Sequence, residues 1–228
     1  MERQVNMEDI SDGRLYGIND MVKADCHGCR DCSVCCQGMG SSILLDPLDI
    51  FRLSCGLNKS FEEMIDEKIE LNVVDGLILP NLKMAGDTER CVFLTEEGRC
   101  GIHAARPGIC RIFPLGRLYE NRSFRYFLQI HECPNAGRSK VKVKKWIDTP
   151  DWKQNEKFIS DWHYFLKELQ DVLKDSPDTG LRKEISMYVL KQFYLQAYNP
   201  EEDFYSQFDR RLAEAAVCTK KWMRKPPV

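Results

Sequence analysis

The chain has 228 residues, with 33 lysines and arginines against 35 aspartates and glutamates, and a net charge of −2. This balance excludes the strongly basic field that drives non-specific nucleic-acid binding. No apolar run approaches the roughly 18 residues that span a bilayer. We therefore expect a protein with no nucleic-acid partner and no membrane span. Residues 1–15 are polar and acidic, without the apolar core of a secretion signal, and predict a cytoplasmic location.

Cysteine spacing is the strongest signal near the N-terminus. Gaps of two residues let a tight turn present two thiolates to one ion, and three such gaps supply more sulfur than one tetrahedral ion uses. A disulfide framework is the alternative, but the odd total of 11 cysteines and a reducing cytosol disfavour it. The spacing predicts a polynuclear iron–sulfur centre or more than one zinc ion. The group consists of Cys26, Cys29, Cys32, Cys35 and Cys36.

The elements that follow are short and mixed. Asp46 and Pro47 are typical of a helix start, so we expect a helix through Leu53 that ends near Gly56. The spacing of apolar residues predicts a second helix over residues 61–71. Short strands are expected at residues 73–74, 77–79 and 91–94. A bound metal would replace part of the hydrophobic core that such irregular segments do not build alone.

The second half of the sequence is helical. Apolar faces predict helices over residues 158–173, 181–193 and 205–216, separated by breaks that contain proline. The predicted fold is therefore α+β, an irregular metal-stabilised cysteine-cluster domain followed by a small helical bundle-like segment. We place the predicted boundaries at residues 1–22 for an N-terminal extension, 23–139 for the cysteine-cluster domain and 140–228 for the helical C-terminal region.

Arginine is the sole basic residue type besides histidine between Met84 and Ser139. Arginine keeps its charge when partly buried, and its planar guanidinium can donate two hydrogen bonds to acidic or sulfur acceptors. Lysine is the usual solvated cation. We expect Arg106 and Arg111, which flank Cys110, to offset the charge of a thiolate-rich centre or to hold an anionic substrate. The alternative is a solvated basic face. The arginines of this segment are Arg90, Arg99, Arg106, Arg111, Arg117, Arg122, Arg125 and Arg138.

The CxxCxxCC run of residues 29–36, followed by Cys91, Cys100 and Cys110 before Pro114, resembles the YkgJ-type cysteine-cluster family. The resemblance covers about residues 23–136 and implies a domain that chelates zinc or iron. Flagellin lysine methylases, which are longer, carry a similar cysteine domain. Cys26 lies one step upstream of the family motif. The resemblance implies eight metal ligands, Cys29, Cys32, Cys35, Cys36, Cys91, Cys100, Cys110 and Cys133.

Eight thiolates are enough for two four-cysteine sites, whereas four suffice for one [4Fe–4S] cluster. Cys35 and Cys36 are adjacent, so we expect their side chains to diverge and to serve two centres rather than one ion. His27, His103 and His131 are weaker ligand candidates, because the site is already rich in sulfur.

Three classes of function remain open. The first is an iron–sulfur protein for redox or protein-modification chemistry, favoured by thiolate density, with a protein substrate or redox partner. The second is a zinc-stabilised protein-interaction module, and the third is a protein that passes metal onward. Thus the expected cofactor is an iron–sulfur cluster, with Zn²⁺ as the alternative. No Walker loop, nucleophile elbow or HExxH pair occurs, so the sequence identifies no catalytic residue and leaves open whether the protein is an enzyme.

Overall fold

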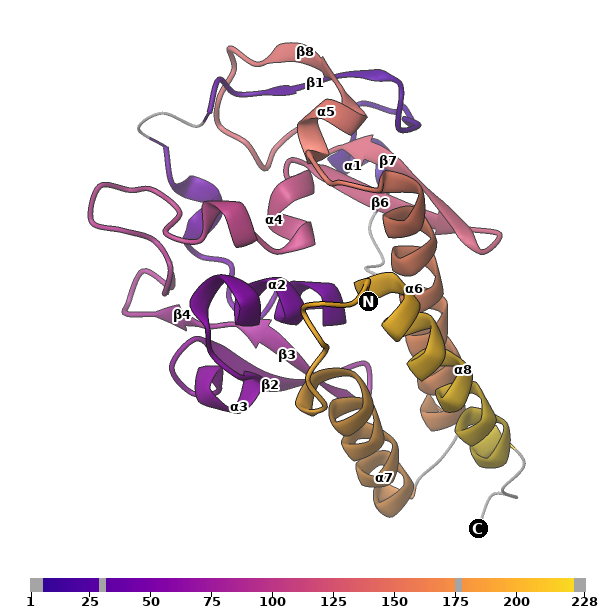
Figure 1. Cartoon of the computed structure of the whole chain (residues 1–228). Helices are drawn as coiled ribbons and strands as arrows, with labels where there is room; N and C mark the ends of the chain where they lie inside the picture. The colour runs from indigo at the N-terminus through magenta and orange to yellow at the C-terminus, as the bar shows by residue number, and fades with distance from the viewer. Residues whose placement is uncertain (1–5, 29–31, 175–177, 224–228) are drawn as a thin grey trace.

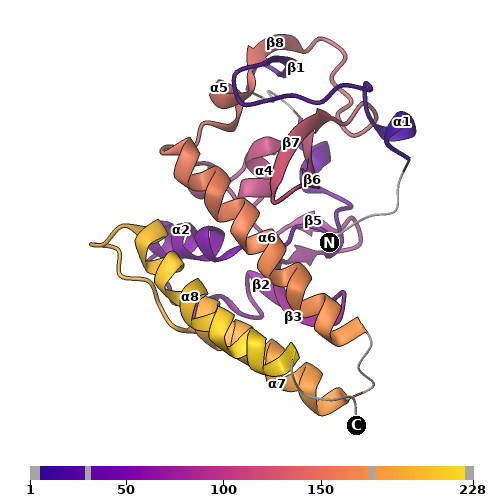
Figure 2. The same ribbon diagram turned by 90° about the vertical axis from the view of Figure 1, so that its right-hand side faces the viewer.

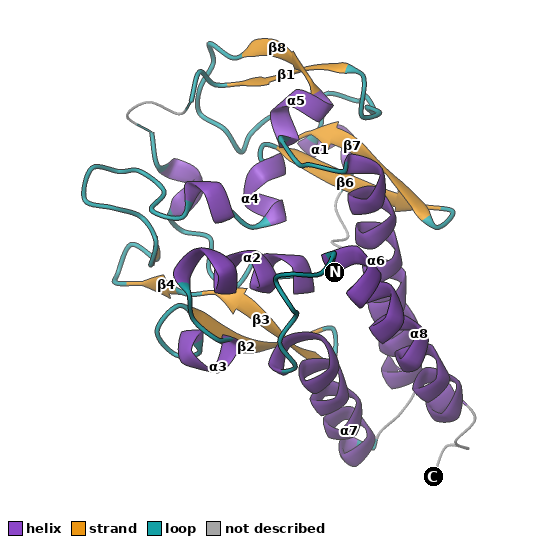
Figure 3. Ribbon diagram, viewed as in Figure 1, coloured by secondary structure: helices purple, strands orange, loops and turns teal. Residues whose placement is uncertain are grey.

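The computed structural model describes residues 6–28, 32–174 and 178–223. It confirms an α+β fold with a helical C-terminal segment (Figure 3). The helices are α1 (Met7–Ile10), α2 (Pro47–Leu57), α3 (Phe61–Met64), α4 (Gly108–Ile112), α5 (Val143–Ile147), α6 (Trp152–Lys174), α7 (Thr179–Leu190) and α8 (Phe204–Met223). Two 3-10 turns, η1 (Val34–Cys36) and η2 (His103–Ala105), and a π-helical turn, η3 (Lys191–Leu195), complete the helical elements.

The strands form four separate two-stranded antiparallel sheets. Hairpins join β2 (Ile69–Val74) to β3 (Leu77–Leu82), β4 (Met84–Ala85) to β5 (Arg90–Cys91), and β6 (Leu115–Glu120) to β7 (Ser123–Leu128). The fourth sheet pairs β1 (Met21–Asp25) with β8 (Ser139–Lys142), with Met21 opposite Lys142. This pair holds the segment just before the first cysteines against the chain that enters α5.

Helix α2 begins at the predicted cap. The Asp46 side chain accepts a hydrogen bond from the Asp49 amide at 2.8 Å, and the Asp49 side chain accepts one from the Asp46 amide at 3.1 Å. This reciprocal capping satisfies two amides that a helix start leaves without partners. The helix ends at Leu57, slightly beyond Gly56, where Asn58 takes a left-handed conformation with φ of 51°.

The helix expected over residues 61–71 is much shorter in the structure. Ser60 caps α3 as the sequence suggests, but α3 ends at Met64. Asp66 has a φ of 68°, which an α-helix does not contain, and the chain then enters β2 with Ile69 buried and Leu71 exposed. The apolar spacing that fitted a helix therefore spans a turn between a helix and a strand. The strand expected at residues 91–94 is also shorter, because β5 ends at Cys91.

The main hydrophobic core joins the β2–β3 hairpin to the helical region. Phe193 is fully buried, with its ring centroid 5.0 Å from that of Trp162 and 5.3 Å from that of Phe165. The Ile78 amide donates a hydrogen bond to the Ser186 hydroxyl at 3.1 Å, which ties β3 to α7. Figure 2 shows α6, α7 and α8 packed together beside this hairpin. Part of the first half thus shares a core with the helices, while the division at residue 139 stays a prediction.

A second, smaller core lies under the β1–β8 and β6–β7 sheets. Figure 1 shows these sheets and α5 on one side of α4, with α2, β2 and β3 on the other, and α6 running alongside both groups. Helix α4 contributes Ile112 to the smaller core, whereas Cys110 packs against the main core. The smaller core consists of Tyr16, Val22, Ala24, Ile112, Leu115, Tyr126, Leu128, Val141, Val143 and Ile147.

No helix in the described ranges combines the length and the apolar composition needed to cross a membrane.

Replacing Phe193 with alanine tests the shared core. We expect Phe193→Ala to lower the free energy of unfolding by about 3–5 kcal/mol, since it removes a fully buried ring. Met187→Ala is the matched control, because this side chain on α7 is 48% exposed. Urea denaturation followed by circular dichroism measures the loss. Proteolytic cleavage within residues 69–82 should also be faster in Phe193→Ala than in the parent protein. Unchanged resistance of this segment to protease would contradict a core shared by the β2–β3 hairpin and the helices.

Candidate metal centre

Five cysteines from three parts of the chain converge in the structure. The charges of Cys91, Cys110 and Cys100 all act on the pKa of Cys36, and the Cys35 thiol forms a hydrogen bond with Cys36. These cysteines also line one common cleft. The structure therefore brings together Cys35, Cys36, Cys91, Cys100 and Cys110, as their joint assignment as ligands requires.

Short elements position these thiols. Cys35 and Cys36 belong to η1, and the backbone bridge between Gln37 and Arg90 holds this turn beside β5, which ends at Cys91. A second bridge, between Leu94 and Cys100, closes the loop that follows β5. Backbone pairing thus fixes two of the three cysteine segments against each other.

Cys35 and Cys36 face the same cleft, although adjacent side chains were expected to diverge. The chain forms a 3-10 turn here, in which adjacent side chains lie about 120° apart, so the turn itself does not bring the two thiols together. Cys35 donates a hydrogen bond to Cys36, which raises the pKa of Cys35 and lowers that of Cys36. Cys36 is therefore the thiol of this pair that ionises first.

Cys110 lies in the cleft on α4. Burial raises the pKa of its thiol to about 12, and the Arg106 guanidinium opposes this rise. The start of α4 is fixed by a 2.7 Å hydrogen bond from the Gly108 amide to the Asp49 carboxylate. Burial, together with the charge of Asp46, raises the pKa of Asp49 to about 8. Sequence reasoning missed Asp49, whose position three residues after the cap indicated only a role in starting α2.

Arg106 acts directly on the cysteines. Its Nη2 donates a hydrogen bond to the backbone carbonyl of Cys110, and its charge favours the thiolate forms of both Cys110 and Cys35. The expected offset of charge at a metal centre and the cofactor-binding role of Arg106 both stay predictions.

Arg111 donates hydrogen bonds to three backbone carbonyls around α4. Its Nε donates a hydrogen bond to the Arg106 carbonyl at 2.9 Å, its Nη2 donates to the Ala104 carbonyl, and its Nη1 donates to the Asp148 carbonyl at 3.3 Å. The guanidinium therefore ties the turn before α4 to the end of α5. A predicted role of Arg111 in holding a cofactor is not needed to explain these contacts and stays a prediction.

The remaining predicted ligands lie in different places. Cys32 is half-buried and lines the cleft. Cys29 falls outside the described residues. Cys133 is half-buried in the loop before β8, where its carbonyl accepts a 3.5 Å hydrogen bond from Arg138, and it is not part of the cleft lining. Cys55, which is isolated from the other cysteines in the sequence and is not among the predicted ligands, is exposed on α2 and lines the cleft.

The donor set suits a soft metal centre. Thiolates are the ligands that zinc and iron–sulfur clusters share. Within the described residues, no three cysteine, histidine, aspartate or glutamate side chains already form a group that could hold a metal ion. Because a preformed site rarely exists in an unfolded chain, metal binding by these thiols would also stabilise the folded state of this region.

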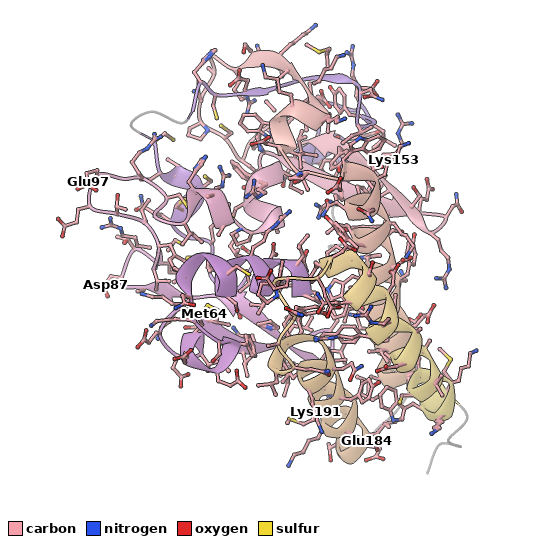
Figure 4. The ribbon with its side chains drawn as sticks, in the orientation of Figure 1. Met64, Asp87, Glu97, Lys153, Glu184 and Lys191 are labelled. Carbon is pink, nitrogen blue, oxygen red and sulfur yellow. The ribbon has the colours of Figure 1, made fainter. Side chains whose placement is uncertain are left out.

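Carboxylates of the cysteine-bearing loops point away from the thiols. Glu97, between Cys91 and Cys100, and Asp87, at the tip of the β4–β5 hairpin, lie at the outer edge of the molecule in Figure 4. Both are exposed. Neither of these two carboxylates lines the cleft, so these parts of the loops offer it no hard oxygen ligand.

Comparison with known proteins gives one match. Residues 28–134 match the CxxCxxCC family, described as a putative zinc- or iron-chelating domain. No curated protein and no solved structure matches the chain. The resemblance inferred from the cysteine motifs is confirmed for these residues, and with it the assignment of a metal-chelating cysteine-cluster domain.

The two pKa shifts predict an order of alkylation. In protein freed of metal by a chelator, iodoacetamide should modify Cys36 before Cys110 at pH 8. A pKa of about 12 leaves about one in ten thousand Cys110 thiols ionised at that pH, whereas the pKa of Cys36 is lowered. Mass spectrometry of digested samples measures both rates. The rate at Cys110 should still rise above pH 10, and the order should disappear in urea. Equal rates in the folded protein would contradict this ionisation pattern.

Proposed function

With residues 28–134 assigned to a CxxCxxCC domain, we propose that the protein binds an iron–sulfur cluster that serves redox or protein-modification chemistry. The observation that carries the proposal is the convergence of five cysteines in one cleft. Four of these thiolates suffice for one cluster or for one zinc ion, and the density of thiols is the reason for preferring the cluster.

Cys36, Cys91, Cys100 and Cys110 are the proposed ligands of this cluster. Support comes from the pKa of Cys36, on which the charges of the other three act together. Cys35 is the proposed hydrogen-bond donor to the Cys36 sulfur, and hydrogen bonds to ligand sulfurs are one means by which proteins set the reduction potential of a cluster. Cys29, Cys32 and Cys133 remain predicted metal ligands, and we assign them to no particular centre.

Arg106 is the proposed counter-charge. A cluster held by four thiolates carries net negative charge, and a nearby guanidinium offsets it at lower desolvation cost than an ammonium group. The partner proposed for this chemistry is a protein substrate or a redox protein, and the proposed location is the cytoplasm. The chemistry would reside in the cluster, with the chain supplying ligands, charge and access.

Anaerobic purification decides the nature of the metal. We expect a brown protein with broad visible absorption, with iron and acid-labile sulfide in similar amounts and a Mössbauer spectrum of a thiolate-bound cluster. A colourless protein that contains zinc would reject the iron–sulfur proposal and leave a zinc-stabilised interaction module or a metal-handling protein.

Replacement of one converging cysteine should reduce the metal content. Cys110→Ser should lower the ratio of metal to protein, because a hydroxyl replaces thiolate poorly in a soft site. Cys218→Ser on α8 is the control, since this residue lies on the helical side of the molecule and does not line the cleft. Elemental analysis after anaerobic purification measures both variants. Full metal content in the Cys110→Ser variant would show that Cys110 is not a metal ligand.

Arg106→Lys should destabilise the cluster although it keeps the charge. Lysine would lose the hydrogen bond that the guanidinium Nη2 donates to the Cys110 carbonyl, worth about 1 kcal/mol, so we expect cluster loss in air to be about fivefold faster. Arg210→Lys is the control, because Arg210 pairs with Glu202 on the surface of α8. Visible absorption followed over time gives the rates of cluster loss. Identical rates in the two variants would show that Arg106 does not stabilise the cluster.

A further inference from the structure

The cleft that holds the cysteines also carries a large excess of positive charge. Its volume is about 2090 Å³, and the carboxylates found among its described lining residues are Glu132 and Asp148. The chain as a whole has a net charge of −2, so this excess is local. The cations that line the cleft are Arg52, Arg99, Arg106, Arg111, Arg117, Lys142, Lys144 and Lys145.

Three of these cations form a lysine wall, defined here as Lys142 at the end of β8 with Lys144 and Lys145 on α5. All three are exposed. None of the ion pairs found within the described ranges involves them. Arg106 acts on the thiolates, whereas the lysine wall lies on the β8–α5 segment. The Lys144 ammonium lies 5.4 Å from the centroid of the Trp152 ring, a contact that keeps its charge. The charges of the wall, above all those of Lys142 and Lys145, are therefore available to a ligand.

The lysine wall is fixed to the helix that carries Cys110. The Trp146 indole Nε1 on α5 donates hydrogen bonds to the carbonyls of Ile112 at 3.2 Å and Phe113 at 3.1 Å. The hydrogen bond from Arg111 to the Asp148 carbonyl adds a second link between α4 and the end of α5. A ligand held by the lysine wall would thus lie in a defined position relative to the cysteines.

The dimensions and the lining of the cleft favour a chain segment. Pockets for small molecules usually enclose about 300–1,000 Å³, and this cleft is larger. Apolar side chains lie among the cations, including Ile109 on α4, which is 38% exposed beside Cys110. Carboxylates that alternate with apolar groups would complement such a surface, as complementary charge does at protein interfaces.

Two other anionic ligands fit less well. Single-stranded nucleic acids stack their bases on accessible aromatic rings. The aromatic side chains that line the cleft, such as Trp146, are buried or half-buried, and none of the large apolar side chains exposed in the described part of the chain is aromatic. A free phosphate would favour unoccupied backbone amides, but the Gly108 amide at the start of α4 already donates to Asp49.

We propose that the cleft docks an extended acidic segment of a partner protein, with its carboxylates on the lysine wall and its apolar side chains toward Ile109. The segment then lies over the converging cysteines, where a metal centre could act on it or be shielded by it. This docking site extends the function proposed above and does not depend on which metal the cysteines hold.

Fluorescence anisotropy tests the docking with the metal-loaded protein. The probe is a fluorescein-labelled 12-residue peptide that repeats Glu-Glu-Leu-Gly, and the comparison ligands are the same peptide with lysine for glutamate and a 12-nucleotide oligothymidine. We expect binding of the acidic peptide and a dissociation constant about tenfold higher for the double variant Lys142→Glu, Lys145→Glu. The milder pair Lys142→Gln, Lys145→Gln should weaken binding less.

The matched control is Lys220→Glu, Lys221→Glu, which makes the same change of net charge at exposed positions of α8. It should leave the dissociation constant within about twofold of the parent, because screening limits the influence of distant charges. Equal weakening in both double variants, no binding of the acidic peptide, or tighter binding of the oligothymidine would each overturn the proposal. Metal content measured on the same samples separates this outcome from failure of the metal-centre proposal.

Discussion

The hydrogen bond between the Asp49 carboxylate and the Gly108 amide joins two parts of the chain that are 59 residues apart. Asp49 caps α2, whose buried face belongs to the main core, and Gly108 begins α4, which carries Cys110. A buried carboxylate gains little from solvent, so its acceptor capacity is directed to these amides. The position of Cys110 relative to the other cysteines therefore depends on a helix cap that contains no sulfur.

Two hydrophobic cores meet at the cysteine cleft, and each supplies one of its walls. The main core holds α2 and the β2–β3 hairpin against the helices, while the smaller core holds α5 beneath the β1–β8 sheet. Cys110 and Ile112 lie on one short helix yet pack toward different cores. The loops between the cores have little apolar area to bury, and thiolate coordination would stabilise the region where packing contributes least.

Local signals in the sequence predicted local structure well. The cap at Asp46 located α2, and apolar spacing located the three long helices, although α6 begins six residues before the expected start and α8 ends seven residues after the expected end. The prediction of one helix over residues 61–71 was wrong, because the spacing of apolar residues carries no information on a left-handed backbone conformation such as that of Asp66. Pairing over long distances, such as β1 with β8, has no local signature. The motif spacing indicated which cysteines matter, but only the fold shows that Cys35 and Cys36 share a cleft and that Cys55 borders it.

The pairing of Met21 with Lys142 sets an order of events during synthesis. Translation proceeds from the N-terminus, so the thiols of the first motif leave the ribosome long before β8 exists to close over β1. Cys110 also emerges well before α5, to whose end Arg111 ties the backbone around α4. The first motif is thus not yet covered by β8 throughout this interval. The converging cysteines would therefore reach their folded arrangement only after translation has passed residue 148.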